Sequence, residues 1–290
     1  MSLRASLIAI VLTSSALAAE PIAVWPNLAP GESARDTGND LPAKEGEVPP
    51  ITRTVNIRRP TMDYFPAEKP NGTGIVILPG GGFSRVVPDL EGSEAAAFLN
   101  PLGISVFVLR YRTNEVKPAD EANWLRPLQD GQRAVRLLRA KANEWKLDGQ
   151  RIGVLGFSAG GQVASILHTA NGEAAYAAID DVDQQSCRPD FSLLIYPWRV
   201  IDDTTGELLS AIHISDQSPP AFIVHTHDDA SSAVGAAKIY IGLKQQKVAA
   251  ELHIYETGGH GYGTRQRPNS VIGTWPDRAT DWLKLHGWGK

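Results

Sequence analysis

The 290-residue chain contains a single cysteine, Cys187, so no disulfide bond can form within it. It also has no excess of basic residues, because it contains 28 lysines and arginines and 32 acidic residues, which gives a net charge of −4. Without a broad positive field, nucleic acid and anionic lipid are excluded as main partners. The hydrophobic share of 42% is ordinary for a folded globular protein. These properties favour a small neutral or weakly charged substrate.

Long hydrophobic runs are missing after the N-terminal region. No later stretch reaches the roughly 18 apolar residues of a membrane-spanning helix. The first residues differ, because Arg4 precedes an apolar run that ends in small residues at 16–19. This pattern is typical of a secretory signal peptide, residues 1–19, cleaved after Ala18 or Ala19, with an uncleaved N-terminal anchor as the alternative. We therefore expect a secreted or periplasmic protein without a membrane span after cleavage.

The segment after the signal peptide has its own composition. Residues 20–50 are rich in proline, glycine and acidic residues and show no apolar period, which predicts an extended N-terminal arm with little regular structure. From residue 51 the pattern changes, and the alternation at 52–57 predicts a half-exposed strand at a sheet edge. Residues 51–290 are expected to form a single folded domain.

Strand and helix patterns alternate through this domain. Short apolar runs rich in β-branched residues predict buried strands at 74–78, 104–109, 152–155, 191–196 and 221–224, with a weaker sixth at 252–255. Helical spacing predicts helices at 93–99, 128–145, 162–168, 233–244 and 276–285. This alternation predicts an α/β fold, a mostly parallel central sheet with helices on both faces.

A glycine-flanked serine follows one of the buried strands. The run Gly-Phe-Ser-Ala-Gly at 156–160 lies between the strand at 152–155 and the helix at 162–168. A strand, a sharp turn and a helix are the context of a nucleophile elbow, in which the serine backbone is strained and the glycines leave room for neighbouring strands. Ser158 is therefore the candidate nucleophile, and a glycine-rich turn without chemistry is the alternative.

A serine hydroxyl becomes a good nucleophile only beside a base that a carboxylate orients. In the chain order serine, acid, histidine, the acid follows a late strand and the histidine comes last. Asp229 after the strand at 221–224 is the first choice for the acid, and Asp228 is the second. His260, in a glycine-rich loop after the last strand, is the candidate base.

A third requirement is a set of fixed donors for the oxyanion that develops during ester cleavage. The run Pro-Gly-Gly-Gly-Phe at 79–83 follows the strand at 74–78, where such donors are found in this arrangement. The backbone N–H groups of Gly81, Gly82 and Ala159 are therefore the candidate oxyanion hole. A phosphate-binding loop is the alternative, but no Lys-Ser/Thr follows and the dinucleotide spacing fails.

Taken together, the motifs resemble the acetylxylan-esterase-like and carboxylesterase (BD-FAE-like) family of the α/β-hydrolases. The resemblance covers about residues 75–290, through Pro-Gly-Gly-Gly-Phe at 79–83, Leu-Arg-Tyr-Arg at 109–112, Leu-Gln-Asp at 128–130, Gly-Phe-Ser-Ala-Gly-Gly at 156–161, Leu-Ile-Tyr-Pro at 194–197 and Gly-Gly-His-Gly at 258–261. The chain departs from the family at 230–234, where Ala-Ser-Ser-Ala-Val replaces a Pro-Val-Val-Pro stretch after the acid.

This resemblance implies an α/β-hydrolase catalytic domain at 51–290 with little or no cap domain, which uses no metal or other cofactor. It also implies a serine carboxylic ester hydrolase that deacetylates a carbohydrate, such as acetylxylan or an acetylated sugar, through an acyl-enzyme. Phe83, Trp198 and Tyr262 are the candidates for contact with that substrate.

Other functions remain open at this point. His225, His227 and Asp229 match the first part of a zinc-binding His-x-His-x-Asp-His cluster, although alanine stands at 230 where the last histidine is needed. A serine peptidase-like hydrolase would use the same three catalytic residue types. A catalytically silent carbohydrate-binding homologue is the non-enzymatic alternative, since a fold does not prove an activity.

Overall fold

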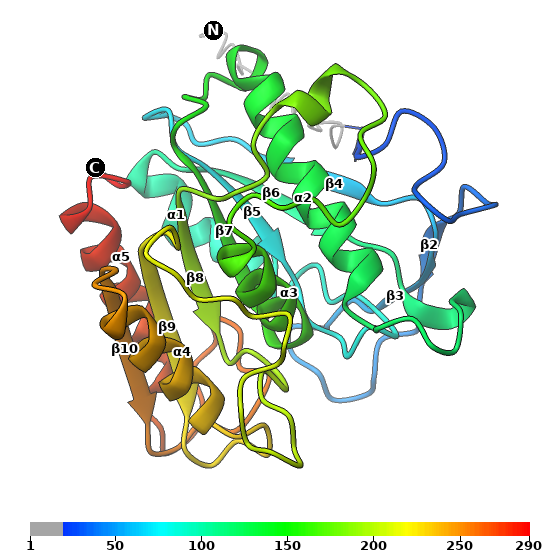
Figure 1. Cartoon of the computed structure of the whole chain (residues 1–290). Coiled ribbons are helices and arrows are strands. Elements are labelled where there is room, and N and C mark those ends of the chain that lie inside the picture. Colours follow the sequence, from blue (N-terminus) through cyan, green and yellow to red (C-terminus); the bar gives the residue numbers. More distant parts are fainter. Residues whose placement is uncertain (1–19) are drawn as a thin grey trace, which may run out of the picture.

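The computed structural model describes residues 20–290, and the predicted signal peptide at 1–19 lies outside the described residues. Its centre is an eight-stranded sheet in the order β1-β4-β6-β5-β7-β8-β9-β10, and β2 and β3 form a separate two-stranded sheet (Figure 1). Strands β5 to β10 run parallel to one another, whereas β4 pairs antiparallel with both β1 and β6. No helix in the described part is long and apolar enough to cross a membrane.

The strands are β1 Ile22–Ala23, β2 Thr37–Asp40, β3 Thr54–Ile57, β4 Thr61–Phe65, β5 Gly74–Leu78, β6 Ser105–Arg110, β7 Ile152–Phe157, β8 Phe191–Ile195, β9 Ala221–Thr226 and β10 Ala250–Tyr255. The α-helices are α1 Ala96–Leu99, α2 Leu125–Ala140, α3 Ser158–Thr169, α4 Val234–Gln245 and α5 Trp275–Leu285. The six strands and five helices expected between residues 74 and 290 are thereby confirmed, with ends shifted by a few residues.

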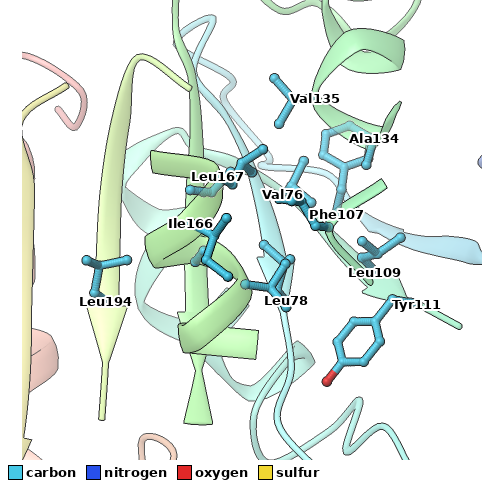
Figure 2. Close-up of a cluster of buried hydrophobic side chains, with 14 of the residues drawn as sticks. Val76, Leu78, Phe107, Leu109, Tyr111, Ala134, Val135, Ile166, Leu167 and Leu194 are labelled. Atoms are coloured by element: carbon cyan, nitrogen blue, oxygen red, sulfur yellow. The ribbon is translucent and has the colours of Figure 1, made fainter. Parts of the chain in front are cut away.

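Two hydrophobic clusters cover the two faces of the sheet. Alternate side chains of β5 point to opposite faces, so Val76 and Leu78 belong to one cluster and Ile75 and Ile77 to the other. The first cluster packs under α2, α3 and α4, as the side chains of Figure 2 show for α2 and α3. The second packs under α1 and α5. A mostly parallel sheet with helices on both faces is therefore confirmed.

The N-terminal arm at 20–50 contains little regular structure, apart from two short strands. Strand β1 extends the main sheet by pairing with β4, and β2 pairs with β3 in the small sheet. The side chain of Trp25 is buried, and its Nε1–H donates to Asp130 Oδ1 over 2.8 Å. Strands β1 and β2, of two and four residues, are the regular structure of this arm, and both form through backbone pairing with strands distant in the sequence.

Two of the motifs that carry the family resemblance act inside the fold. Arg112 and Asp130, from 109–112 and 128–130, form an ion pair of 2.9 Å whose side chains are both 0% exposed. The neighbouring Tyr111 hydroxyl donates to the carbonyl of Pro79 over 2.6 Å. These contacts connect the end of β6 to α2 and to the start of the glycine run at 79–83. The two motifs therefore hold the glycine run in position beside the candidate site.

Candidate active site

The backbone at Ser158 is strained. Strand β7 ends at Phe157, α3 begins at Ser158, and the φ angle of Ser158 is +53°, in the left-handed region that residues with a side chain rarely adopt. A Cβ on Gly156 would meet the backbone of Gly160, and a Cβ on Gly160 would meet the carbonyl of Leu78 in β5. Both glycines are therefore required, so that the turn can bring the serine to the carboxyl edge of the sheet.

The structure brings Ser158, His260 and Asp229 together. The Oγ of Ser158 lies 2.7 Å from Nε2 of His260, and Nδ1 of His260 lies 2.6 Å from Oδ2 of Asp229. The Asp229 side chain is 1% exposed, whereas that of His260 is 34% exposed. A buried carboxylate thus orients a histidine whose far nitrogen reaches the serine, as general base catalysis requires.

The second oxygen of Asp229 also has a partner. Its Oδ1 accepts the backbone N–H of Ser231 over 2.7 Å, and the Oγ of Ser231 accepts the N–H of Arg199 over 3.2 Å. The altered stretch at 230–234 therefore supplies a donor that holds the carboxylate in place. The departure from the family pattern leaves the acid oriented toward His260.

Asp228 binds the backbone of the loop that carries His260. Its carboxylate accepts the backbone N–H groups of Gly258 at 3.1 Å and Gly259 at 2.8 Å. These amide bonds lower the pKa of Asp228 and hold the chain just before His260. The two neighbouring aspartates thus have different partners. Asp229 bonds the imidazole of His260, whereas Asp228 bonds the backbone of the loop that carries His260.

The glycine run at 79–83 folds beside the serine. Gly81, Gly82 and Phe83 have φ angles of +131°, +65° and +65°, so the loop turns sharply after β5. Gly81 and Gly82 line a hollow of about 370 Å³ together with Ser158 and His260. Ala159 lies in the first turn of α3, where backbone N–H groups lack a partner within the helix. Gly81 and Gly82 thus lie beside Ser158, and Ala159 is its neighbour in the chain, so an oxyanion hole of these three amides stays a prediction.

Comparison with known proteins agrees with this architecture. Residues 63–195 match the family model BD-FAE. The chain is 28% identical to an acetylxylan esterase of Xylanibacter ruminicola over 238 residues, which is 74% of this chain but only 44% of that protein. A solved acetyl ester-xyloside bifunctional hydrolase from Caldicellulosiruptor lactoaceticus superposes with a TM-score of 0.72 at 28% identity, over 93% of this chain and 97% of that one.

The chain has the α/β-hydrolase fold. Esterase 2 of Thermogutta terrifontis shares the fold at 19% identity, with a TM-score of 0.68 over 91% of this chain and 98% of that one. In this fold the candidate nucleophile Ser158 follows β7, the candidate acid Asp229 follows β9 and the candidate base His260 follows β10. The three side chains therefore leave parallel strands at the same edge of the sheet.

The α/β-hydrolase site opens into two hollows that meet at Trp198 and His260. The second, of about 430 Å³, extends from Asp229 along Arg199. Trp198 lines both hollows, and its contact with a substrate stays a prediction. Phe83 and Tyr262 are 1% and 0% exposed, so neither side chain is available to a substrate in this structure. The prediction that these two side chains contact the substrate therefore has no support in this structure, because both rings pack inside the fold.

The zinc alternative has no geometric support. His225 is buried, and its Nδ1 lies 3.0 Å from the N–H of Thr226, whereas His227 is exposed. Within residues 20–290, no group of three or more histidine, cysteine, aspartate or glutamate side chains could hold a metal ion. The histidines of the sequence pattern therefore do not assemble with Asp229 into a ligand set.

Sequence reasoning missed Glu91 and Tyr196. Glu91 is only 4% exposed, and burial raises its pKa. Its Oε1 accepts the hydroxyl of Tyr196 over 2.8 Å, and its Oε2 packs against Gly80, where a Cβ would meet it. The Tyr196 hydroxyl in turn accepts the N–H of Gly263 over 3.0 Å. Nothing in the sequence marks Glu91 as buried, since its contacts come from elements distant in the chain.

Replacing Glu91 by leucine is expected to lower kcat about tenfold, because the buried hydroxyl of Tyr196 loses its acceptor and the contact between the glycine loop and the histidine loop is weakened. Glu91→Gln retains a carbonyl acceptor and is expected to recover most of the rate. Steady-state kinetics on 4-nitrophenyl acetate and thermal melts check both variants. If Glu91→Leu lowers only the Tm and leaves kcat at the wild-type level, Glu91 has no positioning role.

Proposed function

We propose that this protein is a serine carboxylic ester hydrolase that removes acetyl groups from a carbohydrate such as acetylated xylan. The observation that carries the proposal is the hydrogen-bonded array of Ser158, His260 and Asp229 beside a glycine loop. The names of the acetylxylan esterase and the acetyl ester-xyloside hydrolase, each 28% identical to this chain, support acetyl esters as substrates.

The mechanism proceeds in two acyl transfers. His260 takes the proton of Ser158 as Oγ bonds to the ester carbonyl carbon, while the amides of Gly81, Gly82 and Ala159 hold the oxyanion. When the bond to the sugar oxygen breaks, His260 gives its proton to that oxygen and an acetyl-serine remains. Water then attacks the acetyl group with His260 as base again, and acetate leaves as Ser158 regains its proton.

The first hollow suits a short acyl group. Ile51, Val87 and Leu90 line it together with Ser158, and its volume of about 370 Å³ includes the open mouth. Small apolar contacts of this kind favour an acetyl methyl group. The hollow that adjoins it at Trp198 leaves room for the alcohol part, and an indole is a suitable surface for a sugar ring.

The sequence of residues 1–19 places this activity outside the cytoplasm in our proposal, in the periplasm or the medium. Acetylated polysaccharide is too large to enter a cell, so an enzyme that deacetylates it is useful where the polymer is.

A fluorophosphonate probe and an acetate assay test the proposal together. We expect the native protein to take up one equivalent of probe, with the label on Ser158 by peptide mapping, and to release acetate from acetylated xylo-oligosaccharides. The heat-unfolded protein is the control and is expected to remain unlabelled, since the serine is activated only in the folded site. Label on another residue, or hydrolysis that survives full labelling, would overturn the serine mechanism.

A further inference from the structure

Three arginines surround the mouth of the site, and no carboxylate of residues 20–290 forms an ion pair with any of them. We propose that Arg85, Arg199 and Arg267 form a subsite for the carboxylate of a uronate sugar that also carries the acetyl ester. This inference rests on the proposed esterase function and specifies the class of its substrate.

Arg85 lies nearest the oxyanion loop. It is exposed, lines the hollow above Ser158, and its backbone packs directly against Gly81. Arg53 lines the same hollow but donates to both carboxylate oxygens of Glu47, at 2.9 and 2.5 Å, which neutralises it. The contrast leaves Arg85 as a cation directed at the hollow with no carboxylate of its own.

Arg199 and Arg267 come from two other loops of the site. The guanidinium of Arg199 lies 5.0 Å from the ring centroid of Trp198, at the junction of the two hollows. Arg267 donates to the carbonyls of His260 at 3.4 Å and Gly261 at 2.9 Å. Both are exposed. Cations from the glycine loop, the β8 loop and the histidine loop thus converge around His260.

The rim of the site, formed by Arg85, Arg199 and Arg267, differs in its charge pairing from the rest of the molecule. The chain has a net charge of −4, and most of its other arginines bond a carboxylate, as Arg58, Arg110 and Arg126 do. Three acidic side chains line the hollows, of which Asp229 is bound to His260 and Glu91 accepts the hydroxyl of Tyr196. The third, Asp203, is exposed and lines the second hollow. The first hollow, which contains Ser158, therefore has no exposed acidic side chain in its lining, and its exposed charge is positive.

A uronate fits these features better than a neutral sugar. A guanidinium matches a carboxylate in shape and can donate two hydrogen bonds to it. Trp198 provides an aromatic surface for the pyranose ring between the arginines and Ser158. An acetylated uronate would place its acetyl group in the first hollow and its carboxylate on the rim. One sugar unit would therefore occupy the hollow beside Ser158 and bind the arginines at the same time.

The test compares two substrates that differ only in charge, a mono-O-acetylated methyl glucuronoside and its uronamide. We expect the wild-type protein to release acetate from the uronate with a kcat/KM about fivefold or more above that for the uronamide, as ion pairs near a surface allow. The triple variant Arg85→Gln, Arg199→Gln, Arg267→Gln is expected to bring this ratio close to one. Added NaCl at 0.5 M should reduce the wild-type ratio, because salt screens exposed charges.

Arg188→Gln is the matched control. Arg188 also donates to a backbone carbonyl, that of Gln217 at 2.7 Å, but it precedes β8 and so lies at the opposite edge of the sheet from Ser158. The ratio should keep its wild-type value in this variant. Equal rates on both substrates in the wild type, or a ratio that survives in the triple variant, would contradict the subsite. Labelling by the fluorophosphonate separates the two proposals, since a labelled enzyme with no preference retains the esterase function and loses only the uronate specificity.

Discussion

The variant Ser158→Ala is expected to lower kcat on 4-nitrophenyl acetate by roughly 10⁴ to 10⁶-fold, the loss seen when a serine hydrolase loses its nucleophile. The physical reason is that His260 then has no hydroxyl to deprotonate at its Nε2, which lies 2.7 Å from Oγ in the native site. The remaining amides can still polarise the carbonyl, so a small rate above that in water persists. Initial rates with purified protein, together with loss of fluorophosphonate labelling, measure the effect.

Ser165→Ala is a matched control within the same helix. The hydroxyl of Ser165 is buried and donates to the carbonyl of Gly161 over 2.8 Å, one turn earlier in α3. This bond contributes little to a helix, so alanine is expected to preserve both the fold and the rate. Hydrolysis by Ser158→Ala at more than about a hundredth of the wild-type rate would show that another group attacks the ester.

Asp229→Asn is expected to lower kcat roughly 10⁴-fold near neutral pH. The backbone N–H of Ser231, which bonds Oδ1 of Asp229, would select the amide oxygen of the new side chain and turn its NH₂ group toward His260. Nδ1 of His260 must then accept a hydrogen bond, which places the imidazole proton on Nε2. In that tautomer the histidine cannot take the proton of Ser158. The kcat of the two proteins on 4-nitrophenyl acetate measures the loss.

Asp228→Asn tests whether the neighbouring aspartate has been assigned correctly. Its carboxylate accepts two glycine amides, and an asparagine oxygen can still accept one of them. The expected loss in kcat is therefore at most about tenfold, from a less rigid histidine loop. If Asp228→Asn were the more damaging of the two substitutions, the acid of the site would be Asp228 and the assignment to Asp229 wrong.

Local patterns predicted the strands and helices of the parallel part well, because buried strands there are continuous apolar runs and the helices have one apolar face. Three strands of the antiparallel part were missed, β1, β2 and β4. Strand β2 reads Thr-Gly-Asn-Asp and β1 has only two residues, so neither has an apolar pattern to detect. Their pairing depends on partners that the fold brings alongside.

The sequence by itself determined the nucleophile and base as candidates, because a strand, a glycine-flanked serine and a helix constrain one another locally, and a glycine loop at the end of the last strand singles out His260. It ranked Asp229 above Asp228 as the acid, but only on position in the loop. The tertiary structure decided that choice at the turn after β9. There the carboxylate of Asp229 points toward the imidazole of His260, and that of Asp228 toward two glycine amides. It also decided the burial of Glu91 and Tyr262 and the gathering of three arginines, since these depend on which distant segments meet at the edge of the sheet.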